Sequence, residues 1–94
     1  MRAIKQSGQF RRDLKREAKG PYRVALAKNF IEIVRALGDD EQLAEKYHDH
    51  ALAGEWKDHR DCHIKPDLVL IYRKPNDDVL ELVRLGSHSE LGLY

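Results

Sequence analysis

Histidine is the residue type that gives this sequence its chemical character. The chain contains five histidines, all in its second half: His48, His50, His59, His63 and His88. Because an imidazole titrates near neutral pH, two that lie close together can act as base and acid in one reaction. The same side chain is also a common metal ligand, so its presence leaves both acid–base catalysis and metal binding open.

The spacing of the histidines favours acid–base chemistry over a metal site. His48 with His50, and His59 with His63, could each supply a pair of ligands. Residues four apart share a face on a helix, but residues 59–65 alternate as a strand does, which would separate the second pair by roughly 13 Å. This alternation places Arg60, Cys62 and Ile64 on one face and Asp61, His63 and Lys65 on the other. Cys62 is the single cysteine, which excludes a zinc site built from several thiolates. We therefore expect no metal and no other cofactor.

One carboxylate and one guanidinium complete a reaction that the histidines can perform. Asp67 lies at the break between two predicted strands, and Arg84 and His88 flank the end of the last strand. Polar groups at strand ends can converge on one rim of a small sheet. Cleavage of a phosphodiester by the adjacent 2′-hydroxyl needs a base, a cation for the phosphorane charge and an acid for the leaving 5′-oxygen. These residue types suit that reaction without an activated serine or cysteine.

Two helices are predicted in the first part of the chain. Ser7 suits a helix N-cap, and the Gly20-Pro21 pair ends one helix and starts the next. The apolar residues of the first helix recur at four-residue spacing, and those of the second at three- and four-residue steps. The expected buried stripes are Phe10, Leu14 and Ala18, then Val24, Ala27, Ile31 and Val34 with Phe30 and Leu37 beside them.

The second part of the chain has the pattern of strands. Residues 59–65, 68–72 and 79–85 are the expected strands, residues 74–78 supply turn chemistry, and residues 2–6 give a weak further strand signal. Helices followed by strands indicate an α+β fold, in which a helical hairpin packs on one face of a small antiparallel sheet. The other sheet face is then expected to be free for a site, in a single domain over residues 1–94.

Composition and charge narrow the class of protein further. No stretch reaches eighteen consecutive apolar residues, and Met1 leads directly into charged sequence without the apolar region of a signal peptide. We therefore expect a cytoplasmic protein without a membrane span. Residues 1–37 carry ten Lys/Arg against three Asp/Glu, a net +7, whereas residues 38–94 carry seven against thirteen, a net −6. This division predicts a basic face that can meet a polyanion or an acidic partner.

Specific motifs then resemble a known family. Residues 50–67 (HALAGEWKDHRDCHIKPD), 70–73 (LIYR) and 83–91 (VRLGSHSEL) resemble the YafQ branch of the RelE toxin superfamily. The signature is a histidine, then Gly-x-Trp, then Arg-[Asp/Glu]-x-His-x-x-Pro-Asp, then Gly-[Ser/Thr]-His. The similarity is strong over about half the chain, and the preceding helical hairpin agrees with it in order and length.

The resemblance implies a function and partners. It implies the toxin of a type II toxin–antitoxin pair, which cleaves mRNA without a metal and, in related members, does so in the ribosomal A site. The expected partners are therefore a cognate antitoxin, mRNA and the ribosome. Because complementary charge speeds association, the antitoxin is expected to be acidic or partly disordered where it meets residues 1–37.

The resemblance also implies roles for particular residues. His50, His63, Asp67, Arg84 and His88 match the active-site positions of the family. His88 would be the general acid and Arg84 would stabilise phosphate charge, whereas Asp67, with His50 or His63, would take the 2′-hydroxyl proton or hold the base. Apart from the resemblance, the basic residues Lys57, Arg60, Lys65 and Arg73 are candidates for contacts to RNA phosphates, with solvated surface charges as the alternative.

Two positions depart from the family pattern and leave alternatives open. Leu68 and Gly92 stand where aromatic residues are usual, and aromatic rings near an RNA site commonly stack on bases. Tyr94 could substitute from the end of the chain. One alternative is a protein of the same fold that has lost catalysis and acts with its antitoxin in a transcription-regulating complex. A histidine-rich metal-binding protein is the other.

Overall fold

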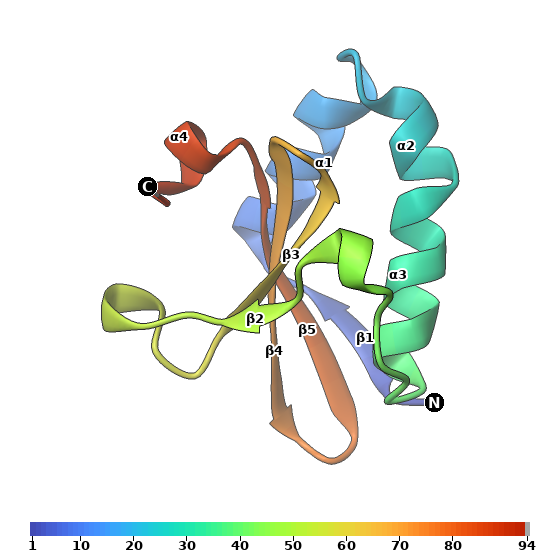
Figure 1. The fold of residues 1–94 in the computed structure, drawn as a ribbon, viewed down its shortest axis with the longest axis vertical. Helices are drawn as coiled ribbons and strands as arrows, with labels where there is room; N and C mark the ends of the chain where they lie inside the picture. Colours follow the sequence, from blue (N-terminus) through green and yellow to red (C-terminus); the bar gives the residue numbers. More distant parts are fainter. Residues whose placement is uncertain (94) are drawn as a thin grey trace.

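The computed structural model describes residues 1–93. Its five strands form one sheet in the order β1-β5-β4-β3-β2 (Figure 1). β1 pairs in parallel with β5, and every other neighbouring pair is antiparallel. The strands are β1 (Ala3–Gln6), β2 (His50–Ala51), β3 (Arg60–Lys65), β4 (Leu68–Asn76) and β5 (Val79–Gly86). The predicted α+β fold with an antiparallel centre is confirmed, and the weak signal at residues 2–6 corresponds to β1.

Three helices cover one face of this sheet. Side chains from these helices and from β4 and β5 form one buried core, which includes Phe10, Phe30, Ile33, Leu70 and Leu82. The helices are α1 (Gly8–Ala18), α2 (Arg23–Ala27) and α3 (Asn29–Gly38), with the short α4 (His88–Leu91) at the far end and the 3-10 turns η1 (Glu45–Tyr47) and η2 (Gly54–Trp56) between. Among residues 1–93, no helix is both long and apolar enough to span a membrane.

The predicted buried stripe of the second helix is confirmed for Phe30 and Leu37, and Val34 packs against the core, but the prediction is wrong for the other three positions. Val24 is 63% exposed and Ile31 is 52% exposed, and Ala27 is also exposed. The helix is interrupted at Lys28, whose backbone (φ −122°, ψ −74°) is not helical, so α2 and α3 do not share one continuous 3.6-residue period. The buried residues of the two helices are Ala25, Leu26, Phe30, Ile33, Leu37 and Gly38.

The predicted turn at residues 74–78 is too long. β4 continues to Asn76, which pairs with Val79, so the chain reverses at Asp77 and Asp78. Pro75 fits within β4 because the register with β5 shifts between Arg73 and Asn76, where a proline does not interrupt the ladder.

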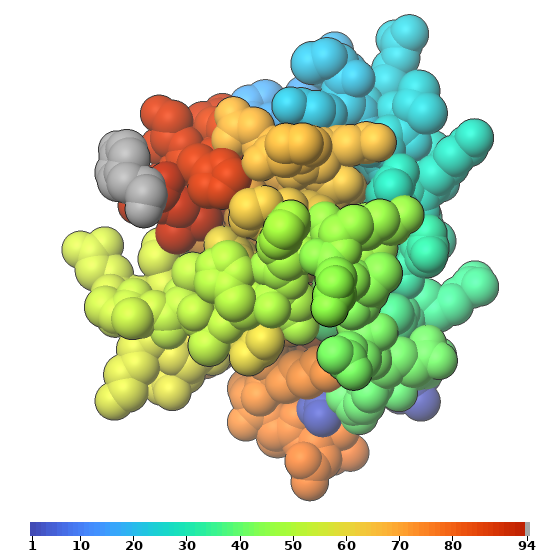
Figure 2. All heavy atoms as spheres, in the orientation of Figure 1, coloured from blue at the N-terminus to red at the C-terminus, as the bar shows by residue number. Residues whose placement is uncertain are grey.

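The sheet face opposite the three helices is partly covered rather than free. Val69, Ile71 and Leu91 form a second buried cluster there, against which the residues between β2 and β3 and the chain after β5 pack, namely Leu52, Trp56, Val83 and Leu93. Figure 2 shows the C-terminal segment (red) beside the segment around residues 50–58 (yellow-green). The polar site must therefore lie where these two covering segments approach one another.

A buried carboxylate on α1 fixes the end of β5. β1 pairs with β5 only as far as Leu82, so the backbone beyond that point needs another partner at the sheet edge. Asp13 is buried, with 4% of its surface exposed, whereas Ala18 of the predicted stripe is exposed. The Asp13 carboxylate accepts hydrogen bonds from the Leu85 N–H (3.0 Å) and from Arg84 Nε (2.8 Å). Burial alone would raise the pKa of Asp13, but the bonds from Arg84 and Leu85 bring it below its usual value.

Replacing Asp13 by alanine is expected to lower the free energy of unfolding by about 3 kcal/mol, because it leaves a buried N–H and a guanidinium unpaired. Since the folded pKa of Asp13 is lowered, its stabilisation is present at neutral pH and is lost as the pH falls below about 5. Urea unfolding at several pH values measures both effects. Asp39→Ala is the matched control, because Asp39 is exposed and makes no side-chain hydrogen bond within residues 1–93. Equal stability of the two variants at pH 7 would contradict the argument.

Candidate active site

Four of the five histidines converge on one end of the sheet face opposite the three helices. The ring centroid of His63 on β3 lies 4.9 Å from that of His88, 5.4 Å from that of His48 and 6.2 Å from that of His50. The strand register places His50 opposite Asp61, and His63 opposite Val69 of the second cluster. Together with Leu52 and Leu93, three of the histidines and Asp61 line a hollow of about 310 Å³. We call His48, His50, His63 and His88 the histidine cluster.

The sequence around α4 positions His88. Ser87 and Glu90 form a capping box, in which the Ser87 hydroxyl accepts from the Glu90 N–H (3.1 Å) and the Glu90 carboxylate accepts from the Ser87 N–H (2.9 Å). Asp67, in the turn between β3 and β4, accepts from the His88 backbone N–H (2.9 Å) and from His88 Nδ1 (2.7 Å). These bonds lower the pKa of Asp67, which therefore stays ionised at neutral pH. Because Nδ1 donates to Asp67, Nε2 of His88 faces away from this pair.

Asp61 is a site residue that the sequence analysis did not identify. It is 2% exposed, and its Oδ1 lies 3.0 Å from His50 Nε2 without a regular hydrogen bond within residues 1–93. Burial raises the pKa of Asp61, and the charges of His50, His63 and His88 oppose that rise. The predicted alternation of residues 59–65 placed Asp61 on the face of His63, which is a signal for its position near the site but not for its burial against His50.

Both ring nitrogens of His50 are engaged. Nδ1 donates to the carbonyl oxygen of His48 (2.8 Å), which leaves Nε2 facing Asp61. Two unprotonated acceptors at this separation would repel one another, so the His50–Asp61 pair is favourable when one of the two carries an additional proton.

The backbone at His48 allows this arrangement. His48 ends η1 in the left-handed conformation (φ 48°, ψ 46°), which is uncommon for a residue other than glycine. The turn directs the His48 carbonyl to His50 and brings the His48 ring beside His63. In the sequence, the spacing to His50 suggests His48 only as a possible metal ligand, and no motif assigns it to the active site.

His63 and His48 are the two members of the histidine cluster whose ring nitrogens make no hydrogen bond within residues 1–93, and of the two His63 is the less exposed. It is partly buried, and its nitrogens make no hydrogen bond within residues 1–93. Burial lowers the pKa of His63; Asp61 opposes this effect, whereas the other three imidazoles of the cluster add to it. His63 is therefore neutral at pH 7 and able to accept a proton. His59 lies apart, bonded to the Lys57 carbonyl (3.0 Å) with its ring against Trp56.

Arg84 shares the sheet face of the histidine cluster by register, since it pairs with Ile71. Its Nε and Nη2 are bonded to Asp13 at 2.8 and 3.4 Å, so the guanidinium is held against α1. Nη1 makes no hydrogen bond within residues 1–93. The structure thus brings His50, His63, Asp67 and His88 together, and it fixes Arg84 through α1.

The predicted RNA-contact residues are distributed around the sheet. Arg60 is bonded to Asp49 (3.3 Å), which also accepts from the Tyr72 hydroxyl (2.5 Å), and Arg73 is bonded to Glu81. Lys57 and Lys65 are exposed, after η2 and at the end of β3 respectively.

The two departures from the family pattern have structural counterparts. Leu68 is fully buried in the main core, so it cannot stack on a base. Gly92 ends α4 in the left-handed region (φ 71°), a conformation that an aromatic residue would adopt only with strain. The proposed substitute Tyr94 lies outside the described residues. Within residues 1–93, no group of three or more His, Cys, Asp or Glu has the geometry to hold a metal ion.

Comparison with protein families and curated proteins identifies relatives over nearly the whole chain. Residues 2–92 match the family described as a bacterial toxin of type II toxin–antitoxin system, YafQ. The chain is 43% identical over 93 residues to the putative toxin YafQ of Haemophilus influenzae, covering 96% of this chain and 91% of that protein. It is 36% identical over 90 residues to the mRNA interferase toxin YafQ of Escherichia coli K12, covering 96% and 95%.

Solved structures agree with this relationship. A metal-bound toxin from Helicobacter pylori superposes with a TM-score of 0.81 at 44% identity, over 97% of this chain and 99% of that one. YafQ from E. coli BL21(DE3) gives a TM-score of 0.81 at 34% identity, over 97% and 98%. The toxin in the E. coli DinJ–YafQ complex gives 0.77 at 32% identity, over 97% and 98%.

Proposed function

The chain belongs to the YafQ family of type II toxin–antitoxin toxins, and we propose that it is an mRNA interferase, an endoribonuclease that cleaves mRNA while it is translated. The 2′-hydroxyl attacks the adjacent phosphorus, the bond to the 5′-oxygen breaks, and one proton leaves the nucleophile as another reaches the leaving group. The observation that carries this proposal is a pair of neighbouring imidazoles whose ring centroids lie 4.9 Å apart. His63 makes no hydrogen bond within residues 1–93, and His88 is bonded to the Asp67 carboxylate.

We assign the general base to His63. Its ring is free of hydrogen bonds within residues 1–93, and the lowered pKa keeps it neutral at pH 7. His50 is a weaker candidate because both of its nitrogens already face acceptors. Asp67 is a weaker candidate because two bonds to His88 occupy it and lower its pKa.

We assign the general acid to His88. Protonated His88 donates from Nε2 to the leaving 5′-oxygen, while Asp67 orients the ring through Nδ1 and holds the start of α4 through the backbone N–H. Asp67 is thus a positioning residue. A proton supplied in this way neutralises the alkoxide as it forms.

Positive charge for the phosphorane comes from His50 and Arg84. Asp61 Oδ1 lies 3.0 Å from His50 Nε2 and orients that ring, and Asp13 fixes the Arg84 guanidinium so that little side-chain freedom is lost when phosphate binds. Because protein side chains fill the roles of base, acid and cation, this scheme involves no metal in catalysis.

The partner of the complex is a cognate antitoxin. The related E. coli toxin forms the DinJ–YafQ complex, and the net charge of +7 in residues 1–37 favours an acidic segment of the antitoxin against α1–α3.

The function is tested by inducing the protein in cells and mapping the 5′ ends of transcripts by primer extension. New ends are expected within translated regions, and blocking translation initiation before induction should remove them. Purified protein added to programmed ribosomes should cut equally well with and without a chelator. Growth arrest without new 5′ ends would favour the alternative of a binding protein that has lost catalysis.

A further inference from the structure

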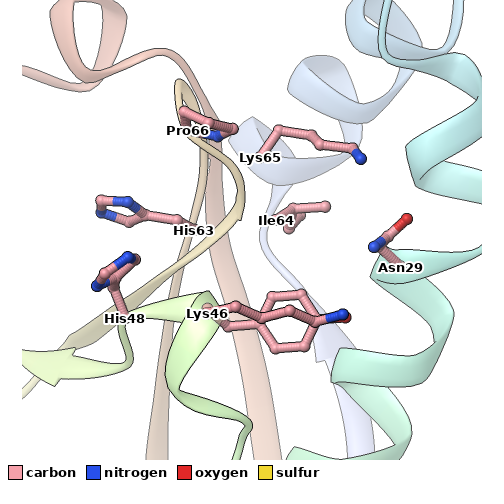
Figure 3. Close-up of a pocket in the computed structure, with 8 residues that line it drawn as sticks. Asn29, Lys46, His48, His63, Ile64, Lys65 and Pro66 are labelled. Carbon is pink, nitrogen blue, oxygen red and sulfur yellow. The ribbon is translucent and has the colours of Figure 1, made fainter.

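A second cleft adjoins the histidine cluster on the α3 side of β3. It has a volume of about 300 Å³ and is lined by Asn29, Lys46, Tyr47, His48, His63, Ile64, Lys65 and Pro66. Figure 3 shows the Lys46 and Lys65 ammonium groups and the Asn29 amide on one side, and the His48 and His63 rings on the other, with Ile64 between them. The cleft therefore shares His48 and His63 with the histidine cluster and extends from them toward Asn29 of α3.

The lining of the cleft has the chemistry of an anion site. Lys46 and Lys65 are exposed and make no ion pair within residues 1–93, unlike Arg60 and Arg73. Lys46 Nζ lies 5.1 Å from the centre of the Tyr47 ring, which restricts its position over the cleft. The described residues lining the cleft include no carboxylate that would compete with a phosphate.

A buried hydroxyl in this cleft lacks a partner. Tyr47 is 4% exposed, and its hydroxyl makes no hydrogen bond within residues 1–93. Leaving such a donor unpaired in the interior costs free energy, so it is typically paired with a ligand or retained for one.

We propose that this cleft, built from Asn29, Lys46, Tyr47 and Lys65, binds the nucleotide of the RNA strand that neighbours the scissile phosphate. The two lysines bind the phosphate of that nucleotide, and Tyr47 and Asn29 offer hydrogen bonds to its polar atoms. His48 stands between this subsite and His63, so the strand passes over it on leaving the histidine cluster. The inference rests on the proposed function and extends it by a binding subsite.

The experiment uses a fully 2′-O-methylated single-stranded RNA, which the protein cannot cleave because the nucleophile is blocked. Affinity is measured by fluorescence anisotropy between 50 and 200 mM salt. Lys46→Ala and Lys65→Ala are each expected to weaken binding about tenfold and to reduce the slope of log K against log salt by about 0.7. Lys5→Ala, an exposed lysine on β1 at the opposite sheet edge, is the matched control and should leave affinity and slope unchanged.

Tyr47→Phe separates binding from folding. It should weaken RNA binding about fivefold while the urea midpoint stays the same or rises, because the hydroxyl has no partner to lose in the folded chain. A marked loss of stability would show that the hydroxyl is satisfied internally and would overturn its role.

Other outcomes overturn the subsite as a whole. These are unchanged RNA affinity in both lysine variants, a loss confined to antitoxin affinity, or no RNA binding by the wild-type chain at 50 mM salt. Cleavage of translated transcripts by the wild-type protein is measured separately, so the subsite can fail while the proposed function stands. Absence of that cleavage is instead the failure of the function.

Discussion

Replacing His88 by glutamine is expected to lower the cleavage rate about 10²- to 10⁴-fold, the range for loss of a general acid. Glutamine can still accept the backbone geometry of α4 and bond to Asp67, but it cannot deliver a proton to the 5′-oxygen. The rate is measured as single-turnover cleavage of an mRNA on programmed ribosomes. Affinity for the 2′-O-methylated RNA should change little, because the loss occurs in the transition state.

His59→Gln is the matched control for this variant. His59 is of the same residue type and lies on the same half of the chain, but it contacts Trp56 and the Lys57 carbonyl rather than the histidine cluster. It should retain cleavage close to the wild-type rate. If the two variants cleaved equally well, the assignment of His88 would be wrong.

Replacing His63 by glutamine is expected to reduce cleavage by a similar factor of about 10² to 10⁴ and, in addition, to change its pH dependence. A general base acts in its unprotonated form, and the pKa of His63 lies below the ordinary value of about 6.5. The wild-type rate should therefore hold at neutral pH and fall as the pH drops through this lowered pKa.

The measurement is the pH profile of single-turnover cleavage between about pH 5 and pH 8, a range in which imidazoles titrate. In His63→Gln the residual activity should lack the acidic decline that the base causes. Retention of that decline, with a rate near the wild-type value, would assign the base to another group such as His50.

Strand β3 and its short neighbour β2 show why the local sequence predicted only part of the site. The alternation in residues 59–65 correctly separated Cys62 and Ile64, which are buried in the main core, from the face of His63. It could not show that Asp61 is buried beneath His50, because that pairing depends on two-residue β2 lying against β3. A strand so short has no periodicity of its own to detect.

The helical half of the chain shows a different limit. Ser7 caps α1 as predicted, since its hydroxyl accepts from the Phe10 N–H at 2.9 Å. The buried stripe of the second helix was wrong at Val24, Ala27 and Ile31 because the helix breaks at Lys28, where no proline or glycine marks the interruption. Periodicity extrapolated across an unmarked break assigns exposed residues such as Val24 and Ile31 to the core.

The amino-acid sequence determined the order of helices and strands, the α+β class and the types of side chain available for acid–base chemistry, because these depend on local periodicity and on short motifs. The tertiary structure decided which groups are engaged and which are free: Asp13 binds the chain 72 residues away at Leu85, Asp67 binds His88, and His63 is left unpaired. Such partnerships depend on strand register and on the closure of distant segments. Strand register and the approach of distant segments produce no periodic pattern in the sequence, so these partnerships are visible only in the folded chain.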